Sequence, residues 1–399
     1  MSFIPEISPS SSATGHAWRG PDAARIDAAI DSAIAAQRLV GAVVLVAHRG
    51  HVVHRRAAGL ADREAGRPMR EDALFRLASV SKPIVSIAAM VLVGQGRLGL
   101  DDAVTRWLPA FRPRLPDGGA EATLTVRQLL THTAGLGYRF FEDSEDGPYA
   151  RASVSDGMDH SGITLAENLR RIAQVPLLYA PGTGWGYSLS IDVLGGVIEA
   201  VTGSPLDDAV RRLVTGPLQM QDTGFVVAAP EARLAIPYVN SPDAPPRRMD
   251  GPTVASPFEG AVGVRFDPSR AFDAAAFPSG GAGMIGSAGD FLRLQETLRK
   301  GGAPLLTAAL VDEMGRNHTG ARGPADAPGF GFGLGFSVLH DPAAARSPES
   351  AGTWRWGGAY GHAWFVDRAR ELSVVAFTNT LYEGMSGRFV ADLRDAVYA

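Results

Sequence analysis

Length, composition and charge set the first limits on this protein. The chain has 399 residues, enough for one large domain or for two domains that share a core. With 45% apolar and 20% charged residues, its composition is that of a globular protein, which excludes disorder, collagen and coiled coils. The net charge of −4 excludes a basic nucleic-acid footprint, and the lack of cysteine excludes disulfides, thiol nucleophiles and thiolate zinc sites.

The N-terminal residues carry no recognisable targeting signal. Residues 1–20 have no Lys or Arg before Arg19 and lack the apolar core of a secretory signal. The longest apolar run, residues 84–93, is about half the roughly 20 residues that a membrane helix needs. We therefore predict a cytoplasmic protein without membrane contact and with a flexible segment over residues 1–20. An export signal trimmed from the sequence stays the alternative.

The first hundred residues predict a helix, a hairpin and a second helix. Isoleucines spaced by four predict an amphipathic helix with Pro21 in its first turn. Two β-rich runs, residues 41–47 and 52–58, flank a glycine turn and are typical of a hairpin. A second helix follows Ser79 and ends near Gly94. Strand pairing scatters the three hairpin histidines over both faces, so we expect solvated rings and no metal site: His48, His51 and His54.

The rest of the chain changes from helices to strands. Short helical patterns separated by Pro/Gly-rich loops occupy residues 126–130, 165–173, 191–201 and 206–214. β-rich runs return at residues 353–356, 363–366 and 372–378, and a closing helix carries Phe389, Leu393 and Val397. This order predicts an α+β fold with a discontinuous sheet domain, in which an antiparallel sheet is flanked by helices. We expect the sheet domain to comprise residues 21–100 with 290–399, and the mainly helical inserted domain to comprise residues 101–289. The active site is expected at the seam between the two domains.

The two lysines differ in their sequence context. The chain has 36 arginines and only two lysines, so either lysine can mark a position where arginine would fail. Lys300 precedes two glycines, which is typical of a helix C-terminus, where a cation is favourable. Lys82 follows Ser79 by three residues in the first turn of a predicted helix, so its amine can reach the serine hydroxyl. A lysine with a lowered pKa can act as a base, whereas arginine stays protonated. On spacing alone, an N-capping Ser79 and a solvated Lys82 remain the simpler interpretation.

Two glycine-rich segments add candidate groups. Residues 181–189 bring Tyr187 to the start of a helical pattern, where a phenol beside a lysine can relay a proton. Residues 354–362 place glycines at a strand end, where a ligand can approach the backbone and the Ala359 N–H can serve as an oxyanion donor. Taken alone, Tyr187 is better explained as a half-buried core tyrosine, and residues 354–362 are equally well explained as a hairpin bend with aromatic packing.

In this order, the three segments resemble the serine β-lactamase and penicillin-binding-protein superfamily, with its Ser-x-x-Lys, Tyr-Ser and Gly-Gly elements. The similarity is greatest to the class C branch and spans roughly residue 41 to the C-terminus. Three longer runs carry it: residues 74–82 (LFRLASVSK), 129–136 (LLTHTAGL) and 331–336 (GFGLGF).

The departures from the β-lactamase pattern point to esters. Where β-lactamases have Lys-Thr-Gly, this chain has Trp356, Gly357 and Gly358, and where they have Tyr-Ser-Asn it has Leu189 after Ser188. These changes remove groups that hold a β-lactam and make the site more apolar. The pattern resembles the family VIII carboxylesterases, which hydrolyse esters on the β-lactamase fold. Residues 59–72 and 382–387 also resemble bacterial members of that group.

The resemblance implies a role for each matched residue. Ser79 is expected to be the nucleophile. Lys82 and Tyr187 together would take its proton, and which of the two is the primary general base stays open. The N–H groups of Ser79 and Ala359 would form the oxyanion hole. The other expected site residues contact the substrate or support the polar network: Trp356, Gly357, Gly358, Tyr138 and Asp192.

The predicted activity is hydrolysis of short- to medium-chain esters, aryl esters among them, through an acyl-enzyme and without metal or cofactor. A β-lactamase, a D-amino-acid peptidase and an acyltransferase remain open. No serine has glycine at both −2 and +2, so the α/β-hydrolase nucleophile elbow is missing. A non-catalytic binding protein is disfavoured by the intact motif residues, and the oligomeric state stays open. Six aromatic residues hint at an apolar acyl or aryl group: Tyr138, Phe140, Phe141, Trp185, Trp356 and Tyr360.

Overall fold

The computed structural model describes residues 18, 20–227, 232–241, 244–324 and 327–399. The prediction for residues 1–20 therefore lies almost wholly outside the described residues. Within that segment Trp18 is described: its Nε1 donates to Val397 O at 3.2 Å, and its ring stacks on Tyr398.

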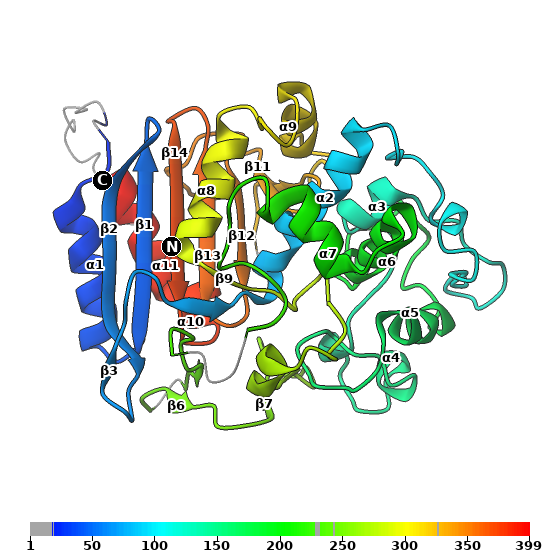
Figure 1. Cartoon of the computed structure of the whole chain (residues 1–399), viewed down its shortest axis with the longest axis horizontal. Coiled ribbons are helices and arrows are strands. Elements are labelled where there is room, and N and C mark those ends of the chain that lie inside the picture. Colours follow the sequence, from blue (N-terminus) through cyan, green and yellow to red (C-terminus); the bar gives the residue numbers. More distant parts are fainter. Residues whose placement is uncertain (1–17, 19, 228–231, 242–243, 325–326) are drawn as a thin grey trace, which may run out of the picture.

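An antiparallel sheet of eight strands forms one half of the molecule (Figure 1). Its spatial order is β10 (Phe330–Phe332), β11 (Ser337–Leu339), β12 (Trp354–Gly358), β13 (His362–Asp367), β14 (Leu372–Thr378), β1 (Gly41–His48), β2 (His51–Asp62) and β3 (Arg67–Pro68). Strands from the two ends of the chain meet inside the sheet, where β1 pairs with β14 and Val44 lies opposite Ala376. The predicted α+β class is confirmed. The division of the chain at residues 101 and 290 stays a prediction.

Helices cover both faces of the sheet and extend beyond its edge. They are α1 (Ala23–Ala35), α2 (Ser81–Gly94), α3 (Val126–Leu130), α4 (Pro148–Arg151), α5 (Leu165–Gln174), α6 (Ser190–Thr202), α7 (Leu206–Val210), α8 (Ala288–Arg299), α9 (Ala308–Gly315), α10 (Glu383–Ser386) and α11 (Arg388–Tyr398). Single turns are η1 (Ala78–Val80), η2 (Val104–Arg106), η3 (Arg139–Phe141), η4 (Arg211–Thr215) and η5 (Pro268–Phe272). Short strands pair as β4 (Leu74–Arg76) with β9 (Ile285–Ser287), β5 (Tyr238–Val239) with β6 (Arg247–Arg248), and β7 (Thr253–Ala255) with β8 (Val264–Phe266).

Each face of the sheet packs against its own hydrophobic core. Along β1, Val43 and Leu45 belong to the large core that includes α2 and α8. The intervening Val44 and Val46 pack instead with α1 and α11. This division follows from the period of two with which strand side chains alternate. Figure 1 shows α8 crossing one face of the sheet and α11 lying behind it.

The helix α2 links the sheet to the helical half of the molecule. Its side chains are buried from Ser81 to Leu92, so it is surrounded on nearly all sides. It contacts α6 and α7, and α6 in turn contacts α3 and α5. In Figure 1 these helices lie on the side of α2 that faces away from the sheet. The N-terminus of α2 is thus placed where the sheet and the helices meet.

Most predicted elements are present, with three corrections. The first helix begins at Ala23 and is capped by the Asp22 carboxylate, so Pro21 precedes the helix and is not in its first turn. The helix predicted over residues 206–214 ends as α7, and a π-helical turn continues it. His54 is buried and not solvated, because its Nε2 lies 2.9 Å from an Asp27 oxygen in α1.

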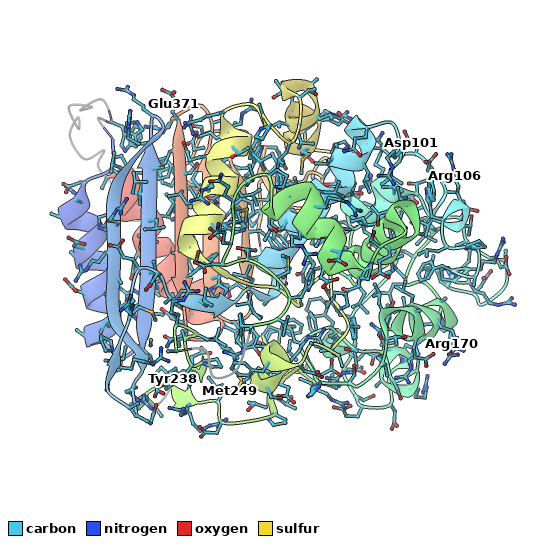
Figure 2. The ribbon with its side chains drawn as sticks, in the orientation of Figure 1. Asp101, Arg106, Arg170, Tyr238, Met249 and Glu371 are labelled. Carbon is cyan, nitrogen blue, oxygen red and sulfur yellow. The ribbon has the colours of Figure 1, made fainter. Side chains whose placement is uncertain are left out.

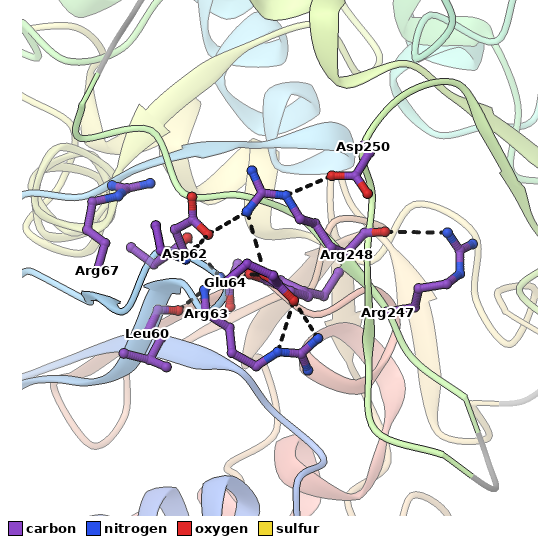
Figure 3. A network of polar contacts seen from close by, with 12 residues as sticks. Leu60, Asp62, Arg63, Glu64, Arg67, Arg247, Arg248 and Asp250 are labelled. Atoms are coloured by element: carbon purple, nitrogen blue, oxygen red, sulfur yellow. Dashed lines mark hydrogen bonds and ion pairs between the residues drawn. The ribbon is translucent and has the colours of Figure 1, made fainter.

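A polar network fixes the turn after β2 to the β5–β6 pair (Figure 3). Arg248 Nη1 lies 2.5 Å from Asp62 Oδ1, and its Nε lies 2.8 Å from Asp250 Oδ1. Tyr238 donates to Glu64 Oε2 at 2.5 Å and accepts from the Arg63 N–H at 2.7 Å. Figure 2 places Tyr238 and Met249 together at this edge and Asp101, Arg106 and Arg170 at the far end of the helical half.

Candidate active site

Ser79 lies in η1, the turn that joins β4 to α2. The residue before it, Ala78, has a φ of 45°, a left-handed conformation that is uncommon for a residue with a Cβ. Neither η1 nor α2 has a side-chain cap. The Ser79 hydroxyl is thus not an N-cap, and it faces two other side chains.

Lys82 is the first of these partners. It is fully buried, and its Nζ donates to Ser79 Oγ at 3.3 Å and to Gly281 O at 2.8 Å. Its Nζ also lies 4.5 Å from the ring centre of Tyr187. Within the described part of the chain, no carboxylate lies within 4.0 Å of this amine. Lys82 is therefore a buried amine turned toward the serine hydroxyl, and the simpler interpretation from spacing, a solvated lysine, is wrong.

Tyr187 is the second partner. Its hydroxyl donates to Ser79 Oγ, across 108 positions of sequence. Both neighbours of Tyr187 are held by one residue: the Gly186 N–H donates to His132 O at 3.0 Å, and the Ser188 N–H donates to His132 Nδ1 at 3.2 Å. The structure thus brings the three predicted catalytic side chains together.

His132 is the residue that the sequence prediction did not single out. It lies in the LLTHTAGL run, is completely buried, and has a φ of 56°. Its ring centre is 5.0 Å from that of Tyr187, and its Nε2 has no hydrogen-bond partner among the described residues. Burial, followed by the charge of Lys82, holds the pKa of His132 well below its usual value. His132 is thus a neutral ring behind Tyr187, and the histidine of that run was the available sequence signal.

The end of β12 lies against the Ser79 turn. A Cβ added at Gly358 would lie 2.3 Å from the Leu77 carbonyl oxygen, so this strand can approach the turn so closely only with glycine. The next residue, Ala359, has left the ladder of β12 and β13, and no acceptor among the described residues binds its N–H. The Ala359 N–H is therefore free to serve as an oxyanion donor beside that of Ser79.

Asp192 lies in the first turn of α6 and is completely buried, not exposed. Its Oδ1 accepts from Ser279 Oγ at 2.5 Å. Burial raises the pKa of Asp192, and the Ser279 hydrogen bond and the charge of Lys82 act against that rise. A Cβ at Gly281 would lie 2.3 Å from Asp192 Oδ2 and 3.5 Å from Lys82 Nζ, so this glycine fits between the two groups.

Aromatic rings surround Tyr187. The rings of Tyr138 and Trp356 each lie 5.2 Å from it, and that of Phe141 lies 6.4 Å away. Phe141 is 40% exposed and stacks on Phe258, which is 52% exposed. Three members of the expected aromatic set thus lie around Tyr187, and Phe258 is an unpredicted neighbour of Phe141. Two other aromatic residues named from the sequence lie elsewhere. Trp185 contacts His132 and Phe332, whereas Tyr360 packs on Phe266.

A family model described as beta-lactamase matches residues 26–399. The chain belongs to the beta-lactamase family. This confirms the family resemblance and the β-lactamase-like fold that the motifs predict.

Individual relatives cover nearly the whole chain. Esterase EstB of Burkholderia gladioli is 55% identical over 377 residues, which are 94% of this chain and 95% of that protein. The solved structure of EstCE1, described as a hydrolase with promiscuous acyltransferase activity, matches with a TM-score of 0.92 and 46% identity, over 94% of this chain and 98% of that one. Unliganded simvastatin synthase of Aspergillus terreus, at 22% identity and a TM-score of 0.72 over 94% and 98% of the two chains, shares the fold.

Proposed function

We propose that this member of the beta-lactamase family hydrolyses esters through an acyl-enzyme on Ser79. The class of reaction, a carboxylic ester hydrolase acting on small molecules, is the predicted one, and the 55% identity to an esterase confirms it. One observation carries the residue assignment: the buried Lys82 amine and the Tyr187 hydroxyl both contact Ser79 Oγ. A serine hydroxyl needs an adjacent base to become a nucleophile near neutral pH.

The reaction proceeds in two balanced steps. Ser79 Oγ bonds to the ester carbonyl carbon while its proton passes to the pair of Lys82 and Tyr187. The resulting oxyanion accepts hydrogen bonds from the N–H groups of Ser79 and Ala359. The bond to the alcohol then breaks, and Tyr187 returns a proton to the leaving oxygen. Water then bonds to the acyl carbon and gives a proton to the same pair. The bond from that carbon to Ser79 Oγ breaks, the acid leaves, and the pair returns the proton to Ser79. Trp356, Gly357, Gly358 and Tyr138 border the reacting groups, and Asp192 supports the polar network.

Replacement of Ser79 tests this assignment. We expect Ser79→Ala to lower p-nitrophenyl butyrate hydrolysis by at least about 10³-fold, because the acyl acceptor is gone. Ser86→Ala is the matched control, since Ser86 lies in the following helix α2, is buried and has no hydrogen-bond partner among the described residues. Activity of Ser79→Ala within tenfold of wild type would show that Ser79 is not the nucleophile.

Acyl transfer to an alcohol is the second candidate activity. It is supported by EstCE1, whose description names promiscuous acyltransferase activity. An alcohol would then replace water in attacking the acyl-enzyme, with the same proton transfer. A β-lactamase or peptidase activity is less well supported, because Trp356 stands where the motif has lysine. A rate panel of esters, nitrocefin and an added alcohol acceptor separates the three activities.

The helices give one observation that bears on the cellular location. None of the helices in the described ranges is long and apolar enough to cross a membrane. A cytoplasmic location stays a prediction from the sequence. The expectation of a reaction without metal or cofactor, and without nucleic acid as partner, also stays a prediction.

A further inference from the structure

A small hollow lies beside the proposed active site and has no part in the mechanism above. It is small and partly open to solvent. Its wall includes Tyr360, which follows the oxyanion donor Ala359, and Ala282, which follows the Lys82 acceptor Gly281. Two residues that line the hollow are therefore direct sequence neighbours of residues at the proposed active site.

Two buried guanidinium groups face this hollow, those of Arg76 and Arg270. Arg76 donates to Pro268 O and Ala235 O, and Arg270 donates to Asp159 O and Phe277 O. All of these acceptors are backbone carbonyls. Within the described ranges no carboxylate lies within 4.0 Å of either side chain. Since a guanidinium has five N–H groups, two on Arg76 and three on Arg270 have no acceptor among the described residues.

Tyr360 adds a hydroxyl group to the wall of the hollow. Its side chain is 5% exposed and lines the hollow, and its hydroxyl has no hydrogen-bond partner in the described part of the chain. Burial raises the pKa of Tyr360 to about 12; the charges of Arg76 and Arg270 act to lower it, and the charge of Asp267 acts to raise it. Both guanidinium groups therefore lie close enough to the hydroxyl to act on it.

The acidic side chains around the hollow form no ion pair with Arg76 or Arg270 in the described ranges. Asp267 lines the same wall, but its Oδ1 accepts from the N–H and the hydroxyl of Ser269. Asp159, Asp192 and Asp273 act on Arg270 only at longer range. A buried cation without a contacting counter-ion is unfavourable, so an anion that fits the hollow would gain several charge-assisted hydrogen bonds.

We propose that this hollow is a binding site for a small monovalent anion, chloride or a short carboxylate, held by Arg76, Arg270 and the Tyr360 hydroxyl. Both anions offer a compact negative charge that accepts several hydrogen bonds at once. The site is separate from the catalytic serine, so it holds whether or not the proposed ester mechanism is right.

Thermal unfolding at constant ionic strength tests the proposal. We expect replacement of gluconate, which is too large for the hollow, by chloride or acetate to raise the Tm of the wild type by about 2 °C. Arg270→Gln should abolish the rise, and Tyr360→Phe, which removes only the hydroxyl, should reduce it. Tyr398→Phe is the matched control: it removes a hydroxyl that binds Asp367 elsewhere, and it should keep the full rise. A larger rise with acetate than with chloride identifies a carboxylate as the preferred ligand.

A bromide soak gives a second readout that does not depend on stability. We expect an anomalous peak between Arg76, Arg270 and Tyr360 in wild-type crystals. If Arg270→Gln fails to fold, Tyr360→Phe still tests the hydroxyl through its Tm response. The proposal is overturned if the wild-type Tm is equal in gluconate, chloride and acetate and the hollow contains water alone.

Discussion

Lys82 and Lys300 lie in opposite environments. The Lys82 amine is fully buried and contacts Ser79 and Gly281. The Lys300 side chain is 55% exposed, caps the C-terminus of α8 and lies 3.6 Å from Glu296. A cation at a helix C-terminus needs only charge, whereas an amine beside a nucleophile must also be able to lose a proton. The role proposed for Lys82 therefore depends on its chemistry as well as its charge.

Substitution by arginine separates charge from basicity. We expect Lys82→Arg to lower kcat for p-nitrophenyl butyrate by about 10²–10⁴-fold, because a guanidinium stays protonated and cannot take the Ser79 proton. Lys300→Arg is the matched control and should retain wild-type activity, since it keeps the charge at the end of α8. Circular dichroism and the Tm of both variants establish that they are folded. Unchanged turnover in Lys82→Arg would refute a role for this amine as a base.

The relative positions of the site residues could be predicted where the residues are close in sequence or the motif is complete. Ser79 and Lys82 could be paired from the sequence because three residues in a helical turn fix their relative position. The place of Tyr187 came from the resemblance, since helical spacing says nothing about residues 108 positions apart. His132 was not singled out because its contacts with the residues on either side of Tyr187 are tertiary. Tyr360 was assigned to the aromatic set on composition, and only packing shows that it points elsewhere.

At the scale of elements, three chain segments must meet at one point. The turn η1, the loop before α6 and the end of β12 each contribute one group to the site. Contact between η1 and β12 depends on Gly358, whose α-carbon faces the Leu77 carbonyl. The spacing of these segments, and so the position of the Ala359 N–H, is set by that contact.

Adding one methyl group at Gly358 tests this dependence. In Gly358→Ala the new Cβ would lie 2.3 Å from Leu77 O, so β12 or the Ser79 turn must move. We expect kcat/KM for ester hydrolysis to fall by about 10²-fold, the effect of misplacing reacting groups by about 1 Å. Gly289→Ala is the matched control, because a Cβ there, in α8, meets no atom within 4 Å. A kcat/KM for Gly358→Ala as high as that of Gly289→Ala would contradict the argument.

Element prediction followed hydrophobic pattern and chain distance. Residues 126–130 and 372–378 were predicted with the bounds that α3 and β14 have, since each has a clear period and clear ends. The strands β10 and β11 and the pair of β4 with β9 were not predicted. Each of these strands has three residues, too few to show a hydrophobic pattern. For β4 and β9 the partners are also far apart in the sequence, since Leu74 pairs with Ser287.

At the scale of the whole molecule, the sheet separates two cores with different tasks. The large core contains Ala78 and Val80, the neighbours of Ser79, and therefore surrounds the reacting groups. The smaller core joins α1 and α11, which come from opposite ends of the chain and contact each other. It closes the face of the sheet away from Ser79 and so contributes to stability without touching the site.

This separation predicts a variant that is unstable but catalytically normal. Phe389 in α11 is fully buried in the smaller core, so we expect Phe389→Ala to lower the free energy of unfolding by about 3–5 kcal/mol. Below its reduced Tm, its kcat/KM should stay within about twofold of wild type, because distant sites act independently. Phe258→Ala is the control of equal size change: its ring is 52% exposed, so it should cost less than about 1 kcal/mol. Urea unfolding with ester assays on the same samples measures both quantities, and a large loss of kcat/KM in folded Phe389→Ala would show that the two cores are coupled.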